Sequence, residues 1–154
     1  MPLSKAITIK RTESSDPDFP YLVALLNQEL RERYGALQTV YDQYNHIINL
    51  ETVVIAYCND IPSGCGCFKK FDNDSVEIKR MFVKQEERKQ GIASTILNEL
   101  EVWAKEDGYS YTVLETANKQ PESIALYQKL GYEVTPNYGQ YIGMENSICM
   151  RKKL

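Results

Sequence analysis

The chain has 154 residues, a net charge of −3 at pH 7, 43% hydrophobic residues and 25% charged residues. These values predict one globular domain spanning residues 1–154, and they exclude the strong positive charge that nucleic acids or anionic membranes attract. The longest apolar runs are strand-sized and the first residues lack the apolar core of a signal peptide, so we expect a cytoplasmic protein without a membrane span.

The first third of the chain predicts one strand and two helices. Ser4–Arg11 alternates between apolar and polar residues, as a strand does. Pro17 suits a first helical turn, and Pro20–Gly35 places leucines at helical spacing before a glycine. The segment 37–50 predicts a second helix, because its apolar residues recur on one face.

The middle of the chain predicts a meander of three strands. Thr52–Cys58 is rich in β-branched residues, the segment 61–66 predicts a turn, and Cys65–Phe71 predicts the returning strand. After a second turn, Ser75–Val83 alternates as the third strand. Connections this short predict that the first half of the sheet is antiparallel.

The last third predicts helices that alternate with strands. A long helix ends at Gly108, Tyr111–Thr116 predicts a strand, and 120–131 predicts a short helix. Tyr132–Pro136 and Ser147–Lys153 predict the final strands. The strand–helix–strand unit from residue 75 to 116 should be a parallel crossover, so the sequence predicts an α/β fold with a mixed sheet.

The four cysteines predict buried reduced thiols and no metal site. Cys65 and Cys67 are two residues apart in a predicted strand and therefore share one face, and Cys58 and Cys149 stand alone. His46 is the only histidine, and the cysteine spacing does not match a zinc site. We also expect His46 to be an ordinary helix residue.

A basic loop and a glycine precede the long helix. Lys84, Arg88 and Lys89 lead to Gly91, where the helix begins. The first N–H groups of a helix have no internal partner and carry a partial positive charge, so such a turn can bind phosphate. The patterns GxxxxGK[ST] and GxGxxG are both absent. An ordinary strand-to-helix connection with solvated charges is the alternative.

Two motifs resemble those of the GNAT superfamily, the N-acetyltransferases that use acetyl-CoA. Arg88, Gly91 and Ala93 match its pyrophosphate motif [QR]xxGx[GA] between a strand and a long helix. The stretch QPESIALYQKLGY, from Gln120 to Tyr132, is similar to its downstream pattern NxxAxxxYxKxGF, with glutamine where asparagine is usual. The element order resembles the superfamily over the whole chain.

The resemblance implies a fold and a set of cofactor contacts. The fold would be a mixed, mostly antiparallel sheet with a central, splayed parallel strand pair flanked by helices, as one GNAT domain. The strand before the motif would carry a bulge and pair with the pantetheine of acetyl-CoA, while the pyrophosphate would lie on the helix start. The cofactor-binding residues implied are Met81, Phe82, Val83, Arg88, Lys89, Gln90, Gly91, Ile92, Ala93, Ser94, Gln120, Ser123 and Tyr127.

Two residues are implied in catalysis. Tyr127 holds the position of the acid that donates to the leaving thiolate, and a core tyrosine is the alternative. Glu77 is the candidate base, acting directly or through water, and the alternative is a surface glutamate paired with Lys79 or Arg80. No metal is implied.

The predicted reaction is acetyl transfer from acetyl-CoA to a primary amine of a small molecule or peptide, directly within a ternary complex. Two alternatives remain open: a non-catalytic acyl-CoA sensor or interaction module on the same fold, and a plain nucleotide-binding domain. We expect no nucleic acid or membrane partner, and a homodimer is compatible with the sequence. The acceptor pocket would be lined by Arg31, Arg33, Tyr34, Tyr41, Tyr138 and Tyr141, which could equally be surface residues.

Overall fold

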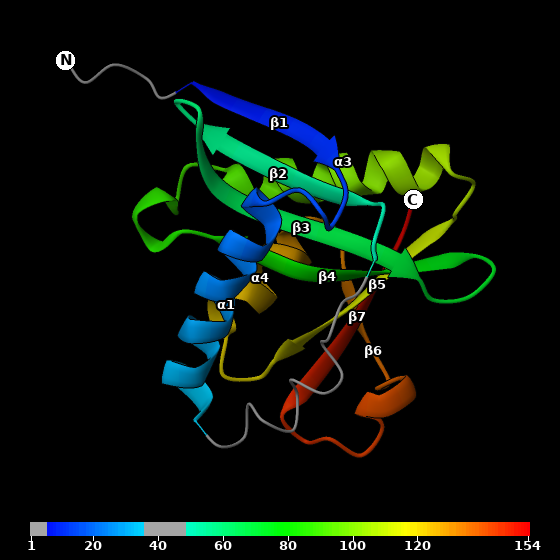
Figure 1. The fold of residues 1–154 in the computed structure, drawn as a ribbon. Helices are drawn as coiled ribbons and strands as arrows, with labels where there is room; N and C mark the ends of the chain where they lie inside the picture. Colours follow the sequence, from blue (N-terminus) through cyan, green and yellow to red (C-terminus); the bar gives the residue numbers. More distant parts are fainter. Residues whose placement is uncertain (1–5, 36–48) are drawn as a thin grey trace. The chain divides into compact units, whose positions relative to one another are not determined.

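The computed structural model describes residues 6–35 and 49–154, and its strands form a mixed seven-stranded sheet in the order β1-β2-β3-β4-β5-β7-β6 (Figure 1). This arrangement confirms the predicted α/β fold with a mixed sheet. The predicted helix at 37–50 and His46 lie outside the described residues, apart from the last two positions of that helix. The described elements are β1 Ile7–Thr12, α1 Asp18–Tyr34, β2 Val53–Cys58, β3 Ile61–Lys70, β4 Ser75–Val83, the 3₁₀ helix η1 Gln85–Glu87, α3 Ile92–Glu106, β5 Tyr111–Ala117, α4 Pro121–Lys129, β6 Glu133–Thr135, the 3₁₀ helix η2 Gly139–Tyr141 and β7 Ser147–Lys153.

The chain divides into two compact units. The first unit holds Met1–Phe68 and Lys79–Leu100, and the second holds Lys69–Ile78 and Glu101–Leu154. Strand β4 and helix α3 each contribute residues to both units. The prediction of a single domain stays a prediction. None of the helices in the described ranges is long and apolar enough to cross a membrane.

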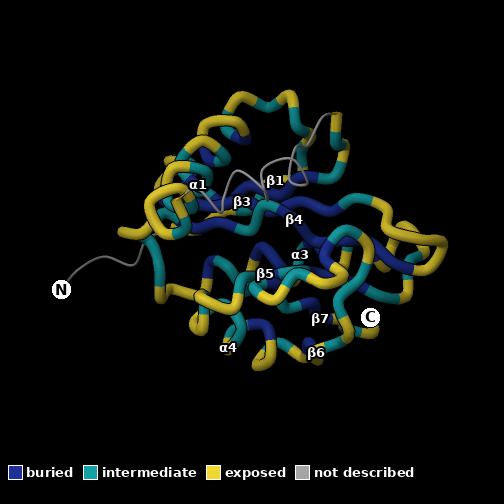
Figure 2. The backbone as a smooth tube through the Cα atoms, turned by 90° about the horizontal axis from the view of Figure 1, so that it is seen from below, coloured by how far each residue is buried: buried dark blue, intermediate teal, exposed yellow. Residues whose placement is uncertain are grey.

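In the first unit, alternation along β3 separates two packing faces. Cys65 and Cys67 point into a core cluster with Leu22 of α1 and Val53 of β2, which confirms that the two thiols share a face. The glycine at position 66 lies on the opposite face, where α3 packs closely. Figure 1 shows α1 and α3 on opposite sides of β2 and β3, and Figure 2 shows the buried strands between them.

The β2–β3 hairpin corrects the turn that the sequence predicts at 61–66. Asn59 and Asp60 form the turn, with φ angles of 50° and 68°, and β3 already begins at Ile61. Two successive residues with positive φ are the signature of the tight turns that match the twist of a hairpin. Pro62 cannot donate to the ladder, and the hydroxyl of Ser63 accepts the Cys58 N–H at 3.3 Å beside a register shift.

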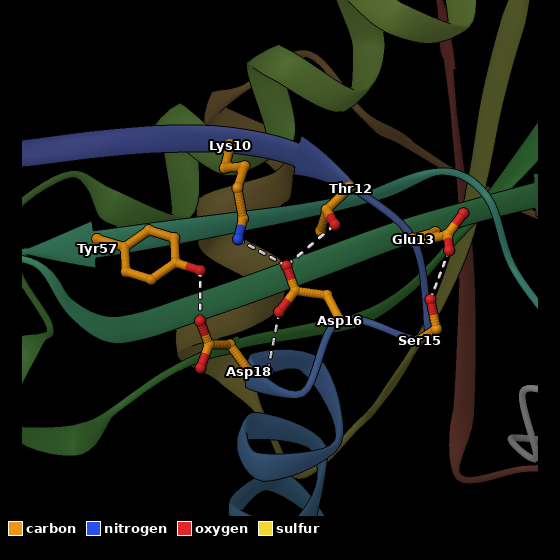
Figure 3. Close-up of polar contacts among 7 residues, drawn as sticks. All are labelled: Lys10, Thr12, Glu13, Ser15, Asp16, Asp18 and Tyr57. Atoms are coloured by element: carbon orange, nitrogen blue, oxygen red, sulfur yellow. Dashed lines mark hydrogen bonds and ion pairs between the residues drawn. The ribbon is translucent and has the colours of Figure 1, made fainter.

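Polar contacts fix the start of α1 (Figure 3). The Asp16 carboxylate accepts hydrogen bonds from Thr12 Oγ1 and from the Asp18 N–H, both at 3.0 Å, and pairs with Lys10 Nζ at 2.6 Å. Tyr57 donates to Asp18 Oδ2 at 2.6 Å. A side-chain acceptor at this position satisfies a backbone donor that the helix leaves unpaired. The contacts thereby hold α1 against β1 and β2.

In the second unit, the start of β4 pairs with β5 in parallel, as the sequence predicts for the 75–116 crossover. The register runs from Ser75 opposite Tyr111 to Glu77 opposite Val113. Strand β7 pairs antiparallel with both β5 and β6, so the last strand in sequence lies between them. This part of the sheet places Glu77 in the interior.

All four cysteines are buried free thiols, as expected from the sequence. Burial raises the pKa of Cys65, and burial likewise raises the pKa of Cys149 to about 11. Thiols with raised pKa values stay protonated near neutral pH and are poor nucleophiles.

Candidate active site

The loop before α3 folds into the turn that the phosphate hypothesis requires. Lys89 and Gly91 have φ angles of 67° and 80°, and Arg88 before them is extended. The Thr95 N–H donates to the Gly91 carbonyl at 3.0 Å, which makes this the first bond of the helix. The N–H groups of Ile92, Ala93 and Ser94 therefore precede the helical ladder and remain donors for a ligand.

Open space surrounds Gly91. A Cβ atom at this position would meet no other atom within 4 Å, and the residue is exposed. The glycine is therefore required by its backbone conformation rather than by contact with the rest of the protein. The absence of a side chain and the open space leave the backbone at the helix start accessible from solvent.

The side chain of Arg88 binds protein groups. Its Nη2 atom pairs with Glu29 Oε1 of α1 at 2.7 Å, and its Nε–H donates to the Val83 carbonyl at 2.9 Å. The guanidinium also lies over the Phe82 ring, at 5.8 Å from its centroid. Arg88 thus links the turn to the end of β4 and to α1.

The remaining predicted residues of the turn lie at the surface or pack below it. Lys89 and Gln90 are exposed, and the Gln90 amide donates to Glu87 at 3.1 Å. Ile92 is 1% exposed and anchors α3 in the core, whereas Ala93 and Ser94 are half-buried. An amphipathic helix buries only one of its faces, so Ile92 lies in the core while Ala93 and Ser94 lie nearer the surface.

One residue of β4 departs from regular strand geometry; the bulge that the resemblance implies stays a prediction. Arg80 has a φ of 56°, which is uncommon for a residue other than glycine and interrupts the regular strand. Its Nη1 donates to Asn27 Oδ1 of α1 at 2.8 Å. Beyond Arg80, Met81 is half-buried, and Phe82 and Val83 are buried.

Glu77 is a buried carboxylate in the second unit. It is 2% exposed, so the alternative of a surface glutamate is wrong. Tyr138 donates its hydroxyl hydrogen to Glu77 Oε2 at 2.8 Å, and Lys69 Nζ lies 3.8 Å from Oε1. A buried carboxylate needs such partners, because burial of an unpaired charge is costly.

Tyr127 is buried on α4. Burial and the nearby Glu115 carboxylate raise the pKa of Tyr127 to about 12, so its hydroxyl is protonated at neutral pH. Its ring packs edge-to-face on Tyr132, with centroids 5.8 Å apart. Glu115 in turn accepts a hydrogen bond from Ser147 Oγ at 2.7 Å. The arrangement presents a neutral hydrogen-bond donor.

The start of α4 carries the two remaining predicted cofactor residues. Gln120 is half-buried, and its Oε1 accepts a hydrogen bond from Thr116 Oγ1 at 3.1 Å. The Ser123 N–H donates to the Gln120 carbonyl at 3.1 Å, and Ser123 is half-buried. Thr116 thus orients the side-chain amide that stands in place of the usual asparagine.

The predicted acceptor residues divide between the units. Tyr138 is half-buried and Tyr141 is 1% exposed in the second unit, so neither is a surface tyrosine. Arg31, Arg33 and Tyr34 lie on the last turns of α1 in the first unit. Tyr41 lies outside the described residues.

Two contacts of the site have no local signal in the sequence. Glu29 pairs with Arg88 across 59 positions, and Tyr138 reaches Glu77 across 61 positions. Glu115 had a weak signal, because it is a carboxylate within the apolar strand YTVLETA. A charge inside such a strand points to a buried, partnered group.

Comparison with known proteins gives one consistent family. The model of the acetyltransferase (GNAT) family matches residues 15–132. A protein named IAA acetyltransferase from Azospirillum brasilense is 29% identical over 156 aligned positions, which cover 96% of this chain and 98% of that protein. A protein named uncharacterized N-acetyltransferase YsnE, from Bacillus subtilis, is 31% identical over 101 positions, which cover 64% of this chain and 67% of that protein.

A solved structure extends the similarity to the fold. The crystal structure of a GNAT family acetyltransferase from Elizabethkingia anophelis with acetyl-CoA bound has a TM-score of 0.70 to this chain. The two are 25% identical, and the match covers 96% of this chain and 98% of that chain.

Proposed function

This chain belongs to the acetyltransferase (GNAT) family, and from that premise we propose that it transfers an acetyl group from acetyl-CoA to a primary amine of a small molecule or peptide. The transfer is direct, within a ternary complex, so that no acetylated side chain of the protein is formed. The observation that carries the proposal is the burial of Glu77, which supplies a partnered carboxylate as a base.

Three parts of the chain supply the groups that bind acetyl-CoA. The N–H groups at the start of α3, with Gly91 beside them, hold the pyrophosphate. The backbone of Met81, Phe82 and Val83, after the irregular Arg80, offers hydrogen bonds to the pantetheine. Gln120 and Ser123 add polar side chains at the start of α4. The open space at Gly91 supports this assignment.

Glu77 removes the proton that the acceptor must lose. A primary amine with a pKa near that of lysine, about 10.4, is mostly protonated at neutral pH and cannot attack in that form. The ammonium group first releases one proton to water. The neutral amine nitrogen then bonds to the acetyl carbonyl carbon, and Glu77 accepts the second nitrogen proton directly or through one water and later releases it to solvent. The carbon–sulfur bond then breaks, which leaves an N-acetyl amide and a thiolate.

Tyr127 stabilises the leaving sulfur. With its pKa raised to about 12, the hydroxyl is a hydrogen-bond donor and a weak acid. Full transfer of its proton to a thiolate with a pKa of about 8.5 would be uphill by roughly 5 kcal/mol. The hydrogen bond therefore provides most of the stabilisation, and the proton that completes the free thiol passes through Tyr127, which water reprotonates.

Glu77→Gln tests the base directly. Because general base catalysis contributes about 10²- to 10⁴-fold, we expect kcat to fall by about 10²-fold or more while the acetyl-CoA affinity is retained. Glu133→Gln, on the exposed face of β6, is the matched control. Steady-state rates of thiol release across pH provide the measurement, and an unchanged profile in Glu77→Gln would remove this residue from the reaction.

A further inference from the structure

We propose that Tyr138 is the positioning residue for Glu77, so that the loop 137–147 sets the pH range in which the base works. The proposal rests on the proposed function, in which Glu77 acts as the base. Tyr138 precedes η2 and comes from a segment 61 positions away from Glu77. Its hydroxyl donates to Oε2 of the carboxylate at 2.8 Å.

Packing fixes the Tyr138 ring in one place. The Phe71 ring lies edge-to-face at 4.8 Å between centroids, and the Tyr141 ring lies edge-to-face on Tyr138 at 5.7 Å. Aromatic pairs in this geometry stabilise each other beyond the area that they bury. The hydroxyl therefore reaches Glu77 from a ring that is held by two others.

The loop behind the ring is also held by specific bonds. The Asn137 side-chain amide donates to the carbonyls of Tyr141, Met144 and Ser147 at 3.0, 3.1 and 3.2 Å. The one side-chain amide thus forms hydrogen bonds with three backbone carbonyls of the same loop. Such a network gives the adjacent Tyr138 a fixed backbone, which a positioning residue requires.

Other charged and titratable groups besides Tyr138 also interact with the Glu77 carboxylate. Lys69 lies 3.8 Å from Oε1 and is 42% exposed, so solvent screens much of its effect. Tyr138 supplies the hydroxyl donor to Oε2. Among the described residues, the titratable and charged groups that interact with this carboxylate include Lys69 of β3, Tyr138 of the loop, Tyr141 of η2 and Cys149 of β7.

The hydrogen bond that Tyr138 donates to Glu77 determines how its loss should change the pH dependence of the rate. An O–H group that donates to a carboxylate favours the ionised form over the neutral form. Only the ionised form of Glu77 can accept the amine proton, so the rate rises with pH along the acid limb. Loss of the donor should therefore lower the rate most along the acid limb of the pH–rate profile.

Tyr138→Phe tests the proposal, because it keeps the ring and removes only the hydroxyl. We expect kcat to fall about tenfold at a pH on the acid limb and the difference from wild type to narrow as the pH rises. A residue that merely supports the fold would lower the rate equally at every pH. The shift of the melting temperature by acetyl-CoA checks that the variant folds and binds.

Tyr57→Phe is the matched control, because it also removes a tyrosine hydroxyl that donates to a carboxylate, that of Asp18 at 2.6 Å. It should keep the wild-type pH profile. In the Glu77→Gln background, Tyr138→Phe should have no further pH-dependent effect, as a double-mutant cycle would measure.

The outcomes separate the two claims. If Glu77→Gln lowers turnover but Tyr138→Phe gives the same profile as Tyr57→Phe, the positioning role is overturned and the proposed function stands. If Glu77→Gln leaves turnover unchanged, the proposed base is wrong and the role of Tyr138 falls with it. A shifted acid limb in Tyr138→Phe that disappears in the double variant supports both.

Discussion

Tyr127 owes its chemical character to two neighbours. Burial removes water from the hydroxyl, and the negative charge of Glu115 disfavours a phenolate beside it. Both effects raise the pKa of Tyr127, so the residue enters the reaction protonated over the whole neutral range. The same environment makes it a weak proton donor, which limits its role to a hydrogen bond followed by a coupled proton transfer.

Replacement of Tyr127 by phenylalanine should isolate that role. The ring contact with Tyr132 survives, and only the donor to the sulfur is lost. Since acid catalysis is typically worth about 10²- to 10⁴-fold and water can substitute in part, we expect kcat to fall at least about tenfold. Acetyl-CoA affinity should change little. The half-buried Tyr109, changed to phenylalanine, is the control.

If kcat of Tyr127→Phe lies within twofold of the wild-type kcat, Tyr127 is excluded from the reaction. A loss of acetyl-CoA binding of similar size to the loss of rate would instead make Tyr127 a binding residue. Measurement of both quantities on the same preparation distinguishes these results.

At the scale of elements, β3 alternates cysteine and glycine, so that each of its two faces packs against a different helix. Cys65 and Cys67 fill the core on the α1 side, while Gly64 and Gly66 leave room on the α3 side. A Cβ atom at Gly66 would lie 2.5 Å from Met81 Sδ and 3.0 Å from side-chain atoms of Ile96 and Leu100. The close approach of α3 therefore depends on the glycine.

Gly66→Ala should lower the stability of the protein. Overpacking lowers the free energy of unfolding by about 1–3 kcal/mol. Alanine also reduces the entropy of the unfolded chain, which raises the free energy of unfolding by about 0.4–1 kcal/mol. We therefore expect the free energy of unfolding to fall by about 1–2 kcal/mol. Denaturant unfolding measures the change. Met81→Ala removes the atom nearest to the new methyl group, so the double variant should be more stable than the sum of the single effects predicts. Strict additivity would show that Met81 is not the obstacle.

Periodicity predicts most elements of this sheet, because buried strands and amphipathic helices leave regular apolar patterns. The parallel pair of β4 and β5 follows from the helix between them. The β2–β3 turn was missed because Pro62 and Ser63 look like turn residues, whereas the turn uses Asn59 and Asp60 in left-handed conformations.

The candidate site was predicted in part for a similar reason. The helix start at Gly91 has a local sequence pattern, so the sequence alone predicts its position. The bond from Tyr138 to Glu77 could not, because it joins residues 61 positions apart on a loop and a strand. Contacts of this kind depend on the path of the whole chain and leave no periodic trace.

At the scale of the whole molecule, binding of acetyl-CoA should change the stability of the protein. A donor that binds only the native protein stabilises it by mass action, so acetyl-CoA should raise the melting temperature even without an acceptor. That shift in melting temperature shows whether a preparation binds acetyl-CoA before any turnover is measured.

The central claim is acetyl transfer to a primary amine, and free-thiol release from acetyl-CoA with a panel of primary amines tests it most directly. We predict that at least one amine gives thiol release with a matching gain of one acetyl group in mass, and that Glu77→Gln lowers that rate by about 10²-fold or more. Thiol release with no amine of the panel, from protein whose melting temperature acetyl-CoA raises, would contradict the claim.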